Sequence, residues 1–78
     1  MNRTDVERDL LEVFSAVLGH PVDTTLTRIN EPGWDSLKHM QIIFAVEEKF
    51  GVQFTEEEIP GLDSFGKFAG QLERRHAA

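Results

Sequence analysis

The 78-residue sequence lacks cysteine and any apolar run long enough to span a bilayer. Without cysteine there is no disulfide, no thiol nucleophile and no thiolate metal site, so packing must stabilise the fold. The first residues lead into a charged amphipathic segment and lack the apolar core of a signal peptide. We therefore expect a cytoplasmic protein that does not insert into membranes.

Basic residues are also scarce, with 8 Lys and Arg against 14 Asp and Glu and a formal net charge of −6. This excess disfavours nucleic acid and suits a basic protein partner, although solubility alone would also explain it. The length allows one domain, residues 1–78, with a single core but without a substantial substrate pocket. We expect a monomer that is not an enzyme. We also expect no metal site, because His20 and His76 do not have the spacing of metal ligands.

Helical periodicity covers most of the chain, and no alternating strand pattern appears. An apolar stripe predicts a helix over residues 4–18, and Gly19 stops it. Residues 20–35 show no period and predict a long loop, which Val22, Leu26 and Ile29 can each pin to a core. Residues 33–37 open a second helix, predicted from Lys38 to Phe50, and Gly51 ends it.

The C-terminal third predicts two further helices. Thr55 and Glu58 have the spacing of a capping box, and Pro60-Gly61 stops that helix within about two turns. A last helix follows Asp63 or Ser64, with a core face of Phe65, Phe68, Ala69 and Leu72. The fold class is therefore all-α, a four-helix bundle with a long loop between helices 1 and 2 and a short third helix.

The stretch Gly33-Trp34-Asp35-Ser36-Leu37 places a serine at the end of the long loop and at the start of the second helix. A hydroxyl in that position is reachable from solvent, and we expect Ser36 to be a point of attachment. The alternative is that Asp35 and Ser36 only cap the helix, since both residue types are preferred there. The two interpretations are compatible.

The second helix is apolar around most of its circumference. Steps of about 100° per residue place Ile42, Ile43, Val46 and Phe50 on one face. They place Leu37, Met40 and Phe44 on another, with Glu47 and Glu48 beside it. The second face either lies buried between helices or forms a docking surface with acidic edges.

These features together resemble an acyl carrier protein or peptidyl carrier protein over nearly the whole chain. The most specific part is Gly33-Trp34-Asp35-Ser36-Leu37, followed by Val46-Glu47-Glu48-Lys49-Phe50-Gly51-Val52. The resemblance implies that a separate transferase moves phosphopantetheine from coenzyme A to Ser36, which Asp35 and Leu37 flank in the attachment motif. The arm would then carry an acyl or aminoacyl cargo as a thioester, which loading and modifying enzymes exchange.

The same residues allow two functions other than that of a carrier. His39 lies three residues after Ser36, within reach for the dyad of a small hydrolase. The sequence offers no orienting carboxylate and no oxyanion-hole motif, and His39 falls near the core stripe, so we expect a partly buried, hydrogen-bonded histidine. The second alternative is a cofactor-free interaction module that binds a partner helix on Leu37, Met40 and Phe44.

The residues after Ser36-Leu37 depart from the fatty-acid type of carrier. That type is usually acidic or neutral here, whereas this chain has Lys38, His39 and Gln41. With Trp34, this composition looks more like stand-alone carriers of specialised biosynthesis, including peptidyl and D-alanyl types. We expect a dedicated set of partner enzymes.

Overall fold

A computed structural model describes residues 3–77, with side-chain burial described for residues 4–75. That range folds into three α-helices and one short 3₁₀ helix, without a strand beyond the isolated bridge between Thr27 and Ser64. The elements in chain order are α1 (Arg3–Leu18), α2 (Ser36–Phe50), η1 (Ile59–Gly61) and α3 (Phe65–Ala77). The predicted all-α class is confirmed.

The four-helix prediction is wrong, because the expected short third helix is a turn followed by η1. The predicted capping box does form: Thr55 N donates to Glu58 Oε1 at 2.9 Å, and Glu58 N donates to Thr55 Oγ1 at 3.2 Å. Pro60 then has no N–H to continue an α-helix, and it disfavours helical backbone at the residue before it. The segment therefore closes with 3₁₀-type bonds from Gly61 N to Glu58 O and from Leu62 N to Ile59 O.

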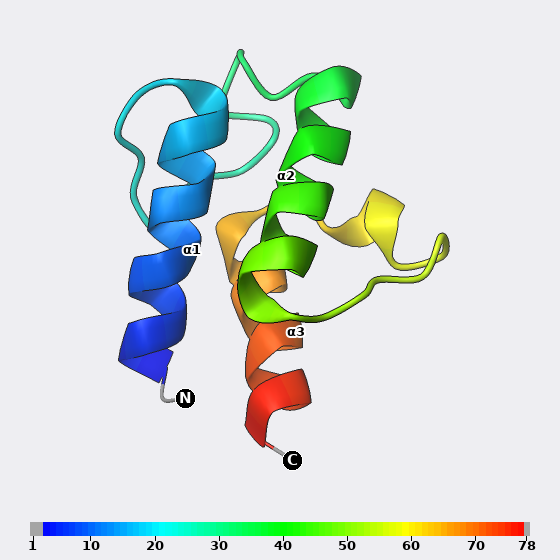
Figure 1. Cartoon of the computed structure of the whole chain (residues 1–78). Helices are drawn as coiled ribbons and strands as arrows, with labels where there is room; N and C mark the ends of the chain where they lie inside the picture. Colours follow the sequence, from blue (N-terminus) through cyan, green and yellow to red (C-terminus); the bar gives the residue numbers. More distant parts are fainter. Residues whose placement is uncertain (1–2, 78) are drawn as a thin grey trace.

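The helices enclose one core. α1 packs against both α2 and α3, and the chain between α1 and α2, residues 19–35, crosses the upper half of the molecule (Figure 1). The core contains an apolar stripe of α1 and the predicted core face of α3, with Val17 of α1 partly buried at its edge. The buried members on these two helices are Val6, Leu10, Val13, Phe14, Phe65, Phe68, Ala69 and Leu72.

The bounds of α2 follow from its two caps. Asp35 is the N-cap, and its Oδ1 accepts a hydrogen bond from Lys38 N at 2.8 Å. Gly51 ends the helix with a left-handed backbone (φ 67°), and its N–H donates to Glu47 O at 2.9 Å. α2 begins at the upper end of the molecule in Figure 1, opposite the end where α1 starts and α3 finishes.

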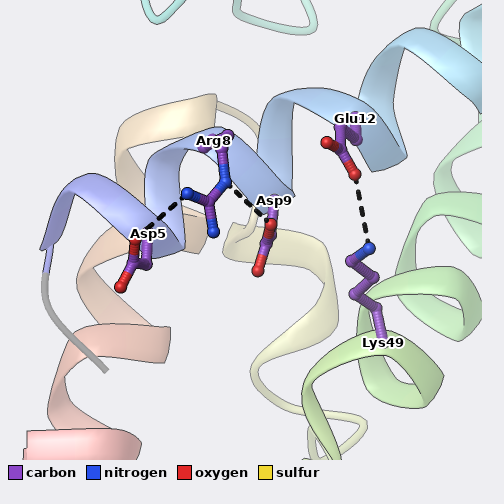
Figure 2. A network of polar contacts seen from close by, with 5 residues as sticks. All are labelled: Asp5, Arg8, Asp9, Glu12 and Lys49. Carbon is purple, nitrogen blue, oxygen red and sulfur yellow. Dashed lines mark hydrogen bonds and ion pairs between the residues drawn. The ribbon is translucent and has the colours of Figure 1, made fainter.

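Ion pairs lie on the outer surface of α1. Arg8 contacts Asp5 at 3.2 Å and Asp9 at 3.3 Å, and Lys49 of α2 reaches Glu12 at 3.4 Å (Figure 2). Exposed pairs of this kind contribute about 0–1 kcal/mol each, so the apolar core and the caps hold the helices together. No helix in residues 3–77 has the length and apolar character that a membrane crossing requires.

The cap of α2 makes a testable prediction about stability. Gly51→Ala should lower the free energy of unfolding by about 1–2 kcal/mol, because a Cβ disfavours the left-handed conformation. Gly70→Ala is the matched control, since Gly70 lies inside α3 and alanine favours helix by about 0.5–1 kcal/mol. A Cβ at either position meets nothing within 4 Å, so neither effect is steric. Urea denaturation measures both, and an equal shift of the two variants would contradict this role of the cap.

Candidate functional site

Ser36 is the first residue of α2 and its side chain is exposed. Its Oγ accepts a hydrogen bond from Arg28 Nη2 at 3.2 Å. Within the described chain, no histidine or carboxylate hydrogen-bonds to this hydroxyl. Ser36 is therefore accessible to another molecule but has no internal general base to activate it.

His39 is not available as that base. Trp34 Nε1 donates to His39 Nδ1 at 2.9 Å, and His39 Nε2 lies 2.8 Å from Ile59 O. An indole N–H can only donate, so Nδ1 is the acceptor and Nε2 carries the proton that Ile59 O accepts. Both ring nitrogens are occupied and the side chain is 5% exposed, which confirms the buried, hydrogen-bonded role predicted for His39.

Trp34 anchors the loop immediately before the site. It is 3% exposed, and its ring lies 5.2 Å from Phe14, 6.4 Å from Phe68 and 5.9 Å from His39, measured between centroids. Trp34 was not among the residues predicted for the core. A signal was present: with Asp35 as N-cap, Trp34 and His39 occupy the N′ and N4 positions, where a hydrophobic staple packs.

A second contact joins the start of the loop, just after α1, to the part of the loop that precedes the site. Glu31 is buried, its Oε2 accepts a hydrogen bond from Gly33 N at 2.8 Å, and its Oε1 lies 3.0 Å from His20 Nε2. His20 Nδ1 lies 3.0 Å from Pro21 O. Both nitrogens of His20 thus face acceptors, an arrangement that only the doubly protonated ring satisfies completely.

These contacts shift two pKa values in opposite directions. The Pro21 carbonyl, and after it the Glu31 carboxylate, raise the pKa of His20 above its ordinary 6.5. The hydrogen bond from the Gly33 N–H, and after it the contact with His20, lower the pKa of Glu31 below its ordinary 4.5. Desolvation of the carboxylate acts in the opposite direction but does not reverse the shift. The pair is therefore complete where Glu31 is ionised and His20 protonated, and it weakens on either side of that range.

The outward side of α2 carries two exposed apolar residues. Leu37 is 66% exposed and Phe44 60% exposed, Met40 is half-buried, and Glu48 is exposed. Ile42, Ile43, Val46 and Phe50 are buried, as predicted for the opposite face. Glu47 has an internal partner, since its Oε2 accepts a hydrogen bond from Phe54 N at 2.8 Å.

The loop behaves partly as expected. Leu26 is buried and Val22 partly buried, but Ile29 is 96% exposed, so the expectation that Ile29 pins the loop to the core is wrong. Thr27 Oγ1 and Asn30 Oδ1 exchange hydrogen bonds with each other's backbone N–H at 3.0 and 2.9 Å, and this turn directs Ile29 outward. Neither Ile29 as a surface residue nor Arg28 as a neighbour of Ser36 was predicted from the sequence.

The described residues contain no group of histidine, aspartate and glutamate side chains that could hold a metal ion. At the start of α2 they combine an exposed serine, a guanidinium beside it and exposed apolar side chains along the same helix. An exposed hydroxyl without a base or pocket fits covalent loading by another protein better than catalysis.

Comparison with known proteins agrees with this class. A family model described as "Phosphopantetheine attachment site" matches residues 8–75. A stretch of 68 residues is 32% identical to a Schizosaccharomyces pombe protein named "Putative acyl carrier protein, mitochondrial". That match covers 82% of this chain and 61% of the yeast protein.

The chain belongs to the family of carrier domains with a phosphopantetheine attachment site. As a member of this family, the domain has phosphopantetheine as its cofactor, covalently bound and derived from coenzyme A. An exposed serine hydroxyl at a helix start suits such a group, because a phosphodiester there is open to solvent and to partner proteins.

The pair of His20 and Glu31 predicts a displaced titration. The NMR titration midpoint of His20 should lie above 6.5, and Glu31→Gln should lower it while the Pro21 carbonyl keeps part of the shift. Because the folded pKa of His20 is raised, the stabilisation that His20 contributes is full below about pH 6.5 and disappears as the pH rises through the folded value. The contribution of Glu31, whose folded pKa is lowered, is lost as the pH falls through its own folded value. Glu57→Gln, which removes an exposed charge in the turn before η1, is the control. A midpoint unaffected by Glu31→Gln would show that the pair does not form.

Proposed function

We propose that this protein carries acyl or aminoacyl intermediates as thioesters on a phosphopantetheine arm attached to Ser36. The observation that carries the proposal is the exposed Ser36 at the start of α2, in a chain whose family is defined by such an attachment. The arm supplies a thiol, which fits a chain that has no cysteine of its own.

The domain's part in loading is to present Ser36 at a fixed place. In the transfer, Ser36 Oγ forms a bond to the phosphorus next to pantetheine and the pyrophosphate bond of coenzyme A breaks. The adenosine 3′,5′-bisphosphate leaves, and the hydroxyl proton passes to a base of the transferase. That base comes from the partner, because among the residues that the structure describes neither His39 nor a carboxylate hydrogen-bonds to Ser36.

We propose that partner enzymes bind a docking surface made of Leu37, Met40, Phe44, Glu47 and Glu48. The phosphopantetheinyl transferase is one of these partners. Two large apolar side chains exposed on one helix are the kind of feature that interfaces bury. Glu48 is free to face a basic partner, whereas Glu47 also holds Phe54 N and contributes less charge to the surface. Asp35 and Leu37 are proposed to flank the arm on either side of Ser36, and Asp35 is also the N-cap of α2.

The pathway is proposed to be a specialised one with its own partner set. Lys38 and Gln41 give the first turns of α2 a less acidic character than the fatty-acid type of carrier has. His39 contributes nothing to that difference on the surface, because it is buried. Trp34 is buried as well, so the proposal of a specialised pathway rests on Lys38 and Gln41.

Loading is tested by intact-mass measurement. Incubation with coenzyme A and a promiscuous phosphopantetheinyl transferase should add the mass of one phosphopantetheine to the wild type and none to Ser36→Ala. Ser15→Ala, which removes a hydroxyl from the last turn of α1, should be loaded like the wild type. A wild type that stays unmodified with several transferases would leave the cofactor-free interaction module as the better explanation.

Docking is tested by the kinetics of the same transfer. Phe44→Ala should lower kcat/KM by roughly tenfold, since truncating a central apolar contact of an interface costs more than 1 kcal/mol. Its effect on the unfolding midpoint should be small, because the ring is mostly exposed. Gln53→Ala, an exposed loop residue outside the docking surface, is the control. Unchanged kcat/KM for both Phe44→Ala and Leu37→Ala would contradict this docking surface.

A further inference from the structure

Arg28 is the one cationic side chain that contacts Ser36 in the described chain, with Nη2 3.2 Å from Oγ. The arginine comes from the loop, eight residues before the serine, and belongs to neither the attachment motif nor the docking surface. Ser36 Oγ is the hydrogen-bond partner of its guanidinium, and no carboxylate of the described residues pairs with it. Its remaining donors are therefore available to a further acceptor.

Hydrogen bonds before and after Arg28 fix the backbone that carries its side chain. Arg28 N donates to Asp63 O at 2.8 Å, and Phe65 N donates to Leu26 O at 2.9 Å, which pins this part of the loop to the start of α3. The reciprocal bonds between Thr27 and Asn30 close the turn that follows. The guanidinium thus reaches Ser36 from a fixed backbone.

Loading changes what Arg28 faces. Ser36 Oγ becomes an ester oxygen, and two further phosphate oxygens that share one negative charge appear beside it. The domain already has a net charge of −6, and the Asp35 carboxylate is the neighbouring residue, so this new charge needs a counter-charge. A guanidinium is the side chain best suited to bind two phosphate oxygens in parallel.

We propose that Arg28 binds the phosphodiester of the loaded arm and fixes the direction in which the arm leaves the domain. This inference rests on the proposed attachment at Ser36. Arg28 acts as a positioning residue: it restrains the phosphate end, and the pantetheine chain beyond it stays free to reach partner enzymes.

The test uses NMR of the loaded protein. Conversion of the wild type from the unloaded to the loaded form should shift the Arg28 Nε–Hε signal, while the Arg74 signal stays in place. The ³¹P transverse relaxation rate of the phosphodiester should fall in Arg28→Gln, because the phosphate loses its restraint, and Arg28→Lys should restore it in part. Arg74→Gln is the matched control, since Arg74 is exposed on α3 and the variant has the same net charge.

The outcomes separate a failure of the proposed role of Arg28 from a failure of the attachment at Ser36. An Arg28 signal that does not move on loading, or a ³¹P rate equal in wild type and Arg28→Gln, overturns the role of Arg28 while attachment stands. A wild type that never gains the arm overturns the attachment itself. If the transferase does not load Arg28→Gln, the shift of the Arg28 signal between unloaded and loaded wild type decides the matter.

Discussion

The hydrogen bond between Trp34 and His39 is the interaction on which the site depends. It joins the last part of the loop to the second turn of α2, and His39 continues it to the carbonyl of Ile59 in η1. The indole also packs on Phe14 of α1 and Phe68 of α3, so the residue two positions before Ser36 touches all three helices. Losing the indole N–H would leave a buried acceptor unpaired, at a cost of about 1–3 kcal/mol.

This anchor explains how an exposed serine is held in a defined place. Within the described residues the Ser36 hydroxyl has a single side-chain hydrogen bond, and its position is set by neighbours on both sides. Trp34 fixes the incoming chain, the Asp35 cap starts the helix at the next residue, and the buried face of α2 holds the helix down. The opposite face of α2 does not pack in the core, so Leu37 and Phe44 can be exposed without loss of packing.

Periodicity was sufficient to predict the three α-helices and the faces they bury, because core positions repeat at helical spacing. It failed where contacts do not follow a period. Ile29 is apolar yet exposed, since a turn closed by Thr27 and Asn30 decides its direction. The contact of Arg28 with Ser36 depends on the path of the loop between them, and no local pattern encodes it.

The failure at the expected third helix has a different cause. Its capping box is present in the sequence and forms, but a cap satisfies the backbone groups at the start of a helix only. Pro60 follows too soon for a stable α-turn to propagate, and 3₁₀ bonds replace it. Trp34 is a different case again, because its staple spacing to His39 was present in the sequence and could have placed it in the core.

Peptide mapping of the loaded protein tests the central claim, attachment at Ser36, most directly. Trypsin cleavage after Arg28 and Lys38 releases residues 29–38, and Ser36 is the only residue with a hydroxyl side chain in that peptide. We predict that this peptide, and no other, carries the mass of phosphopantetheine and loses it as the characteristic pantetheine fragment. An unmodified 29–38 peptide from a protein whose intact mass includes the arm would contradict attachment at Ser36.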